Sequence, residues 1–330
     1  QWRHRNETWG EYAWVLTDYL ARSSSMLQQG NSVADILLYY GEDLNITGLY
    51  GGQAFSSLPQ VPDGYNYDFA NPTVLRSGIK VENRTLVAPS GARYRVLWLD
   101  RNCEVMSLDI LKKIKEFADA GVIICGKEPK SCAGLKADDR AFASIVDDIW
   151  HSRRKNVFAK GLEDCLRRSG IQPDFRATVT SPVAEPVVRH SSPTIKATGG
   201  SAGHFDKLSD QENAVEAPAN APDSYGDFKY VHRTLPDSTQ IYWVRNFSGK
   251  DSNVELSFRD GGKFAAIFNP ENGDVTDADV KFGNGRSTVS LPLLSADARF
   301  VVLSNRPQIK VTIDTVFVNT TDTTMICTSD

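Results

Sequence analysis

The chain has 330 residues and a net charge of −4, from 37 basic and 41 acidic residues. This balance leaves no basic excess of the kind that nucleic-acid-binding proteins carry. No apolar stretch approaches the ~20 residues that a membrane-spanning helix needs. At roughly 100–200 residues per domain, the length predicts two domains, each large enough to bury a core. We therefore expect neither nucleic acid nor a membrane among its partners.

Five Asn-x-Ser/Thr sequons, none with proline at the middle position, favour a secreted protein. The alternative is that most of them are unused. They begin at Asn6, Asn45, Asn83, Asn246 and Asn319. The prediction is that the last four, Asn45, Asn83, Asn246 and Asn319, carry glycans. The chain begins with Gln1 and shows no signal-peptide pattern, so we expect a mature product or, in preference, a fragment of a longer protein.

The cysteines form neither a disulfide framework nor a CxxC metal pattern. They are Cys103, Cys125, Cys132, Cys165 and Cys327. Cys125 ends an apolar run and is typical of a core residue. Cys132 could pair with Cys103 or with Cys165, and both pairings stay open. No metal ligand is predicted within the chain.

A helix is predicted at the start of the chain. Thr8 and Glu11 form a capping box, and Gly30 is a stop signal. Apolar residues recur at helical spacing between these signals, at Trp9, Ala13, Leu16, Leu20 and Leu27. Eight residues before the helix are too few to form a domain that covers its apolar face. We therefore interpret residues 1–30 as the end of a domain whose larger part lies upstream.

Residues 31–175 alternate between strand and helix patterns, which predicts a doubly wound parallel sheet of the flavodoxin-like kind. Val33–Tyr40, Tyr94–Leu99 and Val122–Cys125 are the expected strands. Ser107 is expected to cap a helix that ends at Gly121, and Ile79–Val87 to form a hairpin.

Periodicity is lost over residues 176–224, which are rich in proline and small residues and are predicted to be a linker or a disordered insertion. From Tyr225 the apolar residues recur with period two, and the turn sequences Asn272-Gly273 and Gly283-Asn284-Gly285 separate the predicted strands. Residues 225–305 therefore predict an antiparallel β-sandwich. Residues 306–330 form a tail with one strand-like run, Lys310–Val318.

A search for catalytic motifs finds no phosphate-binding loop, no G-x-S-x-G elbow and no cysteine-nucleophile elbow. Glu42 and Asp43 are the exception, because they follow a predicted parallel strand and so lie at the edge where such sheets bind ligands. An ordinary loop is the stronger interpretation of this pair. Nothing in the sequence identifies two carboxylates placed for glycoside hydrolysis.

Three groups of motifs, in order and spacing, resemble glycoside hydrolase family 106, whose characterised members are α-L-rhamnosidases. The first group is Arg5-Asn6-Glu7-Thr8-Trp9, Tyr19-Leu20-Ala21-Arg22 and Leu27-Gln28-Gln29-Gly30. The second is Val33-Ala34-Asp35, Tyr39-Tyr40-Gly41-Glu42, Gly64-Tyr65-Asn66-Tyr67-Asp68 and Tyr94-Arg95-Val96-Leu97. The third is Val231-His232-Arg233, Ile241-Tyr242-Trp243-Val244-Arg245-Asn246, Phe258-Arg259 and Asn269-Pro270-Glu271-Asn272-Gly273. A departure is Phe268-Asn269, where the family pattern usually has Trp-Asp.

The resemblance implies a secreted enzyme that removes terminal α-L-rhamnose from plant glycans with inversion, through carboxylates on a (β/α)8 barrel that binds calcium. Residues 1–30 would contribute the last helix of that barrel, and the carboxylates would lie upstream of Gln1. No catalytic residue is therefore assigned within the chain. His4, Asn6 and Trp9 are the candidates for lying next to the substrate, although core packing is the more common role for an aromatic residue such as Trp9.

Three functional hypotheses follow. The first is the accessory part of an α-L-rhamnosidase-like hydrolase, inactive by itself and reaching its carbohydrate substrate through the upstream barrel. The second is a non-catalytic carbohydrate-binding or assembly module, which would need an exposed aromatic platform. Tyr242 and Trp243 alternate on one strand, so one of them is expected to face outward. The third is a complete small enzyme that uses the edge at Glu42 and Asp43.

Overall fold

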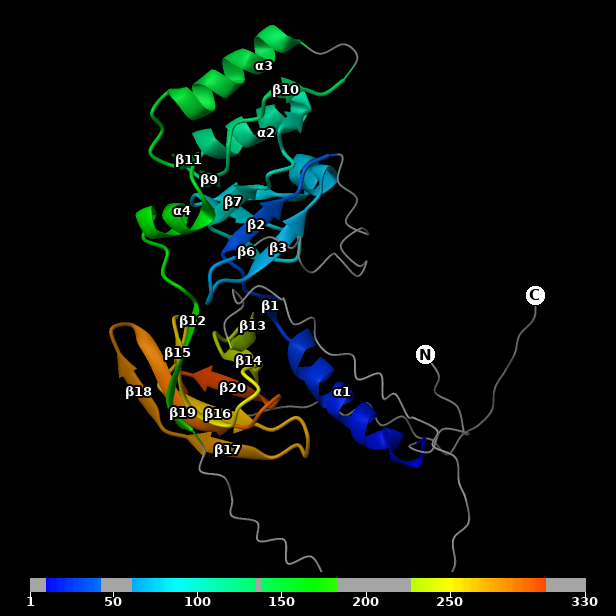
Figure 1. Cartoon of the computed structure of the whole chain (residues 1–330), viewed down its shortest axis with the longest axis vertical. Coiled ribbons are helices and arrows are strands. Elements are labelled where there is room, and N and C mark those ends of the chain that lie inside the picture. Colours follow the sequence, from blue (N-terminus) through cyan, green and yellow to red (C-terminus); the bar gives the residue numbers. More distant parts are fainter. Residues whose placement is uncertain (1–9, 43–60, 135–137, 183–226, 307–330) are drawn as a thin grey trace, which may run out of the picture.

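The computed structural model describes residues 10–42, 61–134, 138–182 and 227–306. Figure 1 shows an α/β domain above a β-sandwich, with a helix extending from the side of the sandwich. The predicted fold class, a flavodoxin-like α/β domain followed by an antiparallel β-sandwich, is confirmed.

The α/β domain is built on a five-stranded parallel sheet. Its strands are β2 (Ile36–Tyr39), β3 (Tyr67–Ala70), β7 (Val96–Leu99), β9 (Ile123–Cys125) and β11 (Val157–Phe158). Their spatial order is β11-β9-β7-β2-β3, which in sequence order is the 2-1-3-4-5 arrangement of flavodoxin-like folds. All four residues of β2 are buried, because both faces of a parallel sheet are covered.

Helices cover the two faces of this sheet. The helices α2 (Leu108–Asp119) and α3 (Asp139–Val146), continued by η5 (Asp147–His151), pack on the face that carries Leu37, Leu97 and Ile124. The helix α4 (Leu162–Arg168) packs on the opposite face, against Ile36 and Val96. The two apolar clusters together form the core of the domain.

Short elements complete the α/β domain. The predicted hairpin is present as β4 (Lys80–Glu82) and β5 (Thr85–Val87), to which β6 (Arg93–Tyr94) adds a third strand. A π-helical turn, η4 (Val74–Gly78), precedes it. A two-stranded parallel ladder joins β8 (Val105–Met106) to β10 (Ser131–Cys132).

The sandwich consists of two antiparallel sheets with a shared apolar core. The six-stranded sheet has the order β1-β13-β14-β20-β16-β17, and the four-stranded sheet has the order β12-β15-β19-β18. The strands are β1 (Asn31–Ser32), β12 (Phe175–Pro182), β13 (Phe228–Thr234), β14 (Gln240–Asn246), β15 (Ser252–Phe258), β16 (Phe264–Phe268), β17 (Val275–Ala278), β18 (Val280–Gly283), β19 (Arg286–Leu293) and β20 (Ala298–Ser304).

Two strands lie outside the interval predicted for the sandwich. β1 pairs with β13, and β12 pairs with β15 along its length. The predicted linker therefore does not begin at residue 176, since residues 176–182 belong to a sandwich strand. After the buried Phe175, the segment Arg-Ala-Thr-Val-Thr-Ser places only the small Ala177 against the core, and Val179 is exposed, which explains why the pattern was weak. Residues 183–224 of the predicted linker and the strand predicted at Lys310–Val318 lie outside the described residues.

The N-terminal helix starts later than its capping box predicts. A 3-10 turn, η1 (Gly10–Tyr12), leads into α1 (Ala13–Gln28), whose N-cap is Tyr12 without a side-chain capping bond. Thr8 lies outside the described residues. The second half of α1 packs on the outer face of the six-stranded sheet through Met26 and Leu27. Arg22 holds the helix there by donating to the carbonyl oxygens of Pro270 (3.2 Å) and Glu271 (2.8 Å).

Candidate functional site

The predicted carboxylate at the carboxyl edge of the parallel sheet has a structural partner. Glu42 accepts hydrogen bonds from the backbone N–H (2.5 Å) and hydroxyl (2.7 Å) of Ser107, the N-cap residue of α2. It also pairs with Arg76 at 3.2 Å. A carboxylate in this place compensates the N-terminal end of the helix dipole. Glu42 therefore caps a helix, while Asp43 lies outside the described residues.

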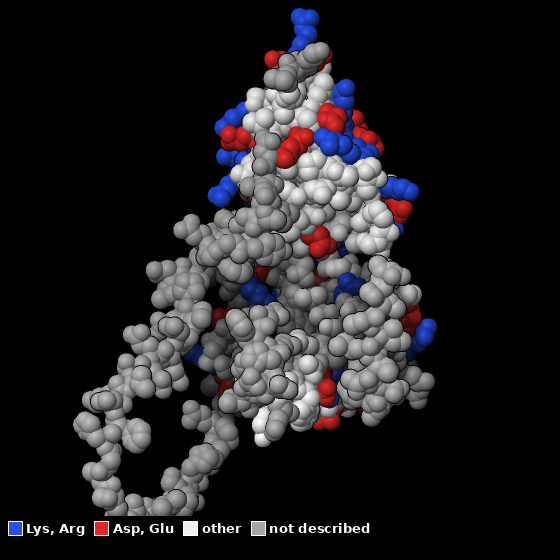
Figure 2. All heavy atoms as spheres, turned by 90° about the vertical axis from the view of Figure 1, so that its right-hand side faces the viewer, with Lys and Arg blue, Asp and Glu red and all other residues white. Residues whose placement is uncertain are grey.

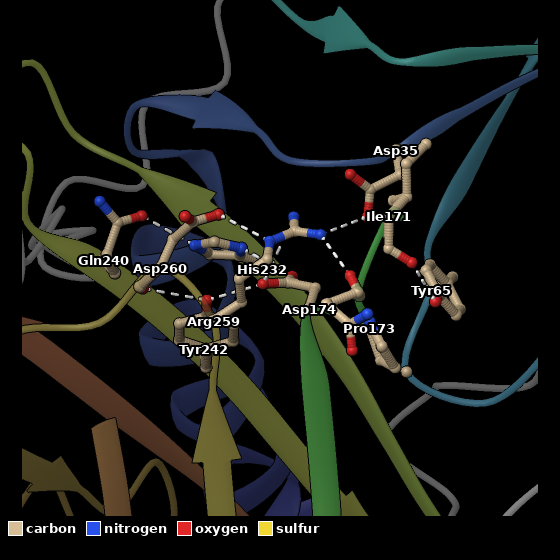
Figure 3. A network of polar contacts seen from close by, with 12 residues as sticks. Asp35, Tyr65, Ile171, Pro173, Asp174, His232, Gln240, Tyr242, Arg259 and Asp260 are labelled. Carbon is tan, nitrogen blue, oxygen red and sulfur yellow. Dashed lines mark hydrogen bonds and ion pairs between the residues drawn. The ribbon is translucent and has the colours of Figure 1, made fainter. Parts of the chain in front are cut away.

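A buried polar network joins the α/β domain to the sandwich (Figure 3). Asp174, which precedes β12, and His232 of β13 form its centre, with a distance of 2.8 Å between Oδ2 and Nδ1. The other ring nitrogen of His232 lies 2.8 Å from the amide oxygen of Gln240. Tyr242 stacks on the imidazole, with ring centroids 3.8 Å apart, and donates from its hydroxyl to Asp174 Oδ1 at 2.9 Å.

Hydrogen bonds fix the orientation of every group around His232. The amide nitrogen of Gln240 donates to the carbonyl oxygen of Ser238 at 2.8 Å, so the amide oxygen must face the histidine. Asp174 offers a carboxylate oxygen to the opposite ring nitrogen. Both nitrogens of His232 therefore face oxygen atoms of neighbouring side chains.

Arg259 extends the network into the α/β domain. Its guanidinium donates to Asp35 Oδ2 at 3.0 Å and to the carbonyl oxygen of Gln172 at 2.8 Å, and it lies 3.8 Å from Asp174. Arg286, from β19, donates to the carbonyl oxygens of Pro173 and Asp174. Two arginines of the sandwich thus hold the segment that leads out of the α/β domain.

The two buried carboxylates respond to this environment in opposite directions. Burial raises the pKa of Asp35 above its ordinary value, because the charge of Arg259 compensates it only in part. Burial also acts to raise the pKa of Asp174, but the hydrogen bond and charge of His232, with Arg259 and Tyr242, hold this pKa below its ordinary value. Asp174 is therefore the more firmly ionised member of the network.

The chemistry of this network is that of a domain junction. His232 and Tyr242 are fully buried, and both ring nitrogens of His232 are engaged. A general base needs to reach a proton on a substrate, and this imidazole has no such access. Paired and hydrogen-bonded charges in a buried position instead fix one orientation of two packed bodies. The network therefore positions the domains relative to one another.

The sequence placed four members of this network in separate motifs and did not bring them together. Asp35 belongs to the second group of resembling motifs, and the third group contains His232, Tyr242 and Arg259. Asp174 was missed, since it lies between a helix and a strand pattern with no motif around it. The signal that could have found it is a charged residue directly before Phe175, the large aromatic residue with which β12 begins.

The aromatic pair on β14 does not form an exposed platform. Tyr242 is fully buried in the junction, and Trp243 is half-buried and packs in the apolar cluster with Met26 and Leu27 of α1. The prediction that one of the two faces outward is correct in its alternation, but α1 covers the outward member. The binding-module hypothesis thus loses the feature that was expected to support it on this strand.

The sequons differ in what the fold allows. The side chain of Asn246 is fully buried, and its amide nitrogen donates to the carbonyl oxygens of Lys250, Leu293 and Leu294. No room remains for a glycan there, so the prediction for Asn246 is wrong, and the residue instead closes the turn after β14. Asn83 is exposed in a hairpin turn and stays a prediction. Asn45 and Asn319 lie outside the described residues, as do His4, Asn6 and Trp9.

The described cysteines are unpaired thiols, and the described acidic and histidine side chains form no metal-binding cluster. Cys103, Cys125, Cys132 and Cys165 are all free, so neither pairing suggested for Cys132 is present. Burial raises the pKa of the Cys103 thiol to about 12. Across the described ranges, no three His, Cys, Asp or Glu side chains are grouped to hold a metal ion. No helix in those ranges is long and apolar enough to cross a membrane.

Comparisons with known proteins decide the family. A family model described as alpha-L-rhamnosidase, glycoside hydrolase family 106, matches residues 1–194. The chain belongs to this family. The match covers α1, the whole α/β domain and β12, and therefore includes the segment that carries Asp174.

Two longer relatives extend the comparison across the sandwich. The solved structure of a rhamnosidase from Novosphingobium sp. PP1Y superposes with a TM-score of 0.72 at 27% identity, over 94% of this chain and 26% of that protein. A protein of Formosa agariphila that carries the name of a beta-glucuronidase is 25% identical over 308 residues, which is 92% of this chain and 22% of the relative. This member of family 106 thus spans about a quarter of the length of these relatives.

Proposed function

We propose that this chain is the accessory C-terminal portion of a secreted α-L-rhamnosidase-like glycoside hydrolase, and that the carboxylates of the reaction belong to a domain upstream of it. In this proposal the complete enzyme releases terminal α-L-rhamnose from plant glycans. The family match and the partial coverage of longer relatives support the assignment.

The exposed half of α1 is the single observation that carries the proposal. Trp14, Val15, Leu16 and Leu20 of α1, together with Tyr12 of the preceding turn η1, are large apolar residues and are exposed, with 61% of Trp14 and 44% of Leu20 accessible. Contiguous apolar surface of this kind marks an interaction site. A helix that packs on the sandwich with one half and extends this surface beyond it is suited to join the sandwich to a further domain (Figure 1).

Hydrogen bonds and ion pairs hold α1, the sandwich and the α/β domain in one fixed arrangement. Arg22 anchors α1 to the sandwich, and Asp174 and His232 anchor the sandwich to the α/β domain. All three parts would therefore be presented to an upstream domain in a fixed geometry. A site positioned by packed elements is held more accurately than one on loops.

The resemblance also implies calcium for the complete enzyme. The described residues of this chain do not fit a calcium site, because such a site needs six to eight oxygen ligands and no cluster of even three acidic side chains suited to a metal ion is present among them. Any calcium would belong with the upstream carboxylates in this proposal.

Hydrolysis of a chromogenic α-L-rhamnoside tests the proposal. The present chain is compared with the same chain extended upstream through a barrel domain, each with calcium supplied. Activity in the extended protein alone is the expected result. Activity of the short chain would overturn the proposal, and inactivity of both proteins on a panel of rhamnosides would overturn the assigned substrate.

A further inference from the structure

The amino edge of the parallel sheet opens into a cleft of about 680 Å³, within the ~300–1,000 Å³ typical of small-ligand sites. Its lining comes from the ends of β7, β9 and β11, from the hairpin turn before β5, and from the last residues of α2 and α4. This edge is opposite to the one at which Glu42 caps α2. It is therefore separate from the edge where doubly wound sheets usually bind ligands.

Four cations and one carboxylate line this cleft. Arg84, Arg95, Lys155 and Arg168 are the cations, and Asp119 is the carboxylate. Asp119 is already paired with Lys115 at 2.9 Å and Arg154 at 2.6 Å. The cleft is therefore basic although the whole chain has a net charge of −4. Elsewhere, on the face of the α/β domain seen in Figure 2, acidic and basic side chains lie interspersed.

The cations of the cleft are largely available to a ligand. Within the described residues, neither Arg84 nor Lys155 forms an ion pair. Arg95 and Arg168 reach their carboxylates, Asp35 and Asp164, only at 3.5 and 3.6 Å. All four side chains thus keep donors that can face an anion.

Arg84 occupies a backbone position that disfavours it. Asn83 and Arg84 are the central residues of the hairpin turn, with φ of 50° and 63°. Glycine is the preferred second residue of such a turn, because it adopts positive φ without steric cost. The side chain of Arg84 lies across Gly121 at the end of α2, where an added Cβ would meet it at 3.2 Å. The arginine is thus held over the cleft at a conformational cost.

Helix ends define which anion fits. The ends of α2 and α4 that line the cleft are their C-terminal ends, at residues 119–121 and 168–169. Helix C-termini carry partial negative charge, which disfavours a small dense anion such as phosphate. A ligand that combines spaced carboxylates for the cations with hydroxyl groups for the polar side chains at the helix ends, Asp119 and Ser169, fits both sets of groups.

We propose that this cleft binds an acidic saccharide, with uronate carboxylates at Arg84, Arg95, Lys155 and Arg168 and sugar hydroxyls at the helix ends. This proposal depends only on the cleft and does not require the chain to take part in hydrolysis. The cleft would anchor a charged glycan on the α/β domain, away from the exposed half of α1.

Titration calorimetry with an unglycosylated preparation of the chain tests the proposal. The probes are trigalacturonate and its fully methyl-esterified form, in which an uncharged methyl ester replaces each carboxylate. We expect the free acid to bind and the ester not to bind. Equal binding of both forms, or of neither, would overturn the proposal, as would tighter binding of inorganic phosphate or of a short DNA duplex.

The substitution Arg84→Gly is expected to weaken ligand binding without destabilising the fold. Glycine relieves the strained turn, so the free energy of unfolding is expected to stay equal or to rise. Loss of one charge-assisted contact should weaken trigalacturonate binding about tenfold. Lys155→Gln is expected to act in the same direction, while Arg140→Gln, which removes an exposed cation of α3, should leave affinity unchanged. Unaltered affinity in both cleft variants would place the ligand elsewhere and overturn the assignment.

Discussion

The sandwich meets its two neighbours through surfaces of opposite character. Toward the α/β domain it presents buried charges, with Asp174 and His232 almost or completely inaccessible to solvent. Toward α1 it presents an apolar surface formed by Ile241, Phe268 and Phe300. The first surface is closed on every side by hydrogen bonds, whereas the helix on the second continues beyond the sandwich with apolar residues exposed.

The polar surface fixes the orientation of the domain that it contacts, whereas the apolar surface contributes attraction without fixing an orientation. Hydrogen bonds between charged groups are directional and costly to leave unmade, so the polar junction admits few relative orientations of the two domains. Apolar contact is non-directional and grows with the buried area. An apolar helix can therefore take on a further partner by extending its contact, which a closed polar network cannot do.

Removal of Asp174 is expected to have the largest effect. Asp174→Ala leaves His232 and Tyr242 buried without their shared acceptor and removes the charge that faces Arg259 at 3.8 Å. Breaking a buried pair in this way costs about 3–5 kcal/mol. Urea unfolding followed by circular dichroism should show a large fall in the midpoint. Since the network links the domains, we also expect one transition to separate into two.

Asp260→Ala is the matched control for this change. Asp260 pairs with the same arginine, Arg259, at 3.3 Å, but 45% of its side chain is exposed. Exposed ion pairs contribute about 0–1 kcal/mol. If Asp174→Ala is no more destabilising than Asp260→Ala, the network does not hold the domains together.

The apolar interface should respond less strongly than the polar junction. Met26 is 1% exposed in the cluster between α1 and the sandwich. Met26→Ala is expected to cost about 2 kcal/mol, near the lower end for such changes, because the neighbouring Leu27 and Trp243 are only partly buried and can adjust. Val15→Ala, on the exposed half of the same helix, serves as the control and should change the free energy of unfolding by less than about 0.5 kcal/mol.

Acid should weaken the polar junction in a defined direction. The folded pKa of Asp174 is depressed, so its contribution to stability is fully present above the unfolded pKa of about 3.9 and is lost as the pH falls toward the folded value. The raised pKa of Asp35 acts oppositely, since its protonation relieves the cost of burying its charge.

A comparison of the parent chain with Asp174→Asn isolates the contribution of the ionised Asp174 to stability. The variant should be less stable than the parent chain at pH 6, and the difference should narrow as the pH is lowered through 4 and below. Free energies of unfolding measured from pH 6 to pH 3 provide the check. A difference that stays constant over this range would show that Asp174 is not ionised in the folded chain.

The sequence predicted the layers of the molecule better than its contacts. Alternating strand and helix patterns sufficed for the flavodoxin-like sheet, and period-two runs sufficed for most of the sandwich, because both signals are local. β12 was missed because, after the buried Phe175, it carries mostly small and polar residues and an exposed valine, Val179. The network around Asp174 was missed because its members are brought together only by the crossing of the chain between two sheets. Asn246 shows the same limit, since a sequon does not reveal whether its asparagine is buried.

A substitution in the exposed half of α1 should have the smallest effect on stability. It also tests most directly whether an upstream domain covers this part of the helix. In the present chain, Trp14→Ser removes an apolar side chain that is 61% exposed, so the free energy of unfolding should shift by less than about 0.5 kcal/mol. In the protein extended upstream, the same side chain is expected to be buried, and the substitution should then cost about 1.5–3 kcal/mol. Thermal unfolding of both pairs of proteins measures this. An equally small effect in the extended protein would mean that the upstream domain does not pack on α1, and the apolar half of the helix would then need another partner.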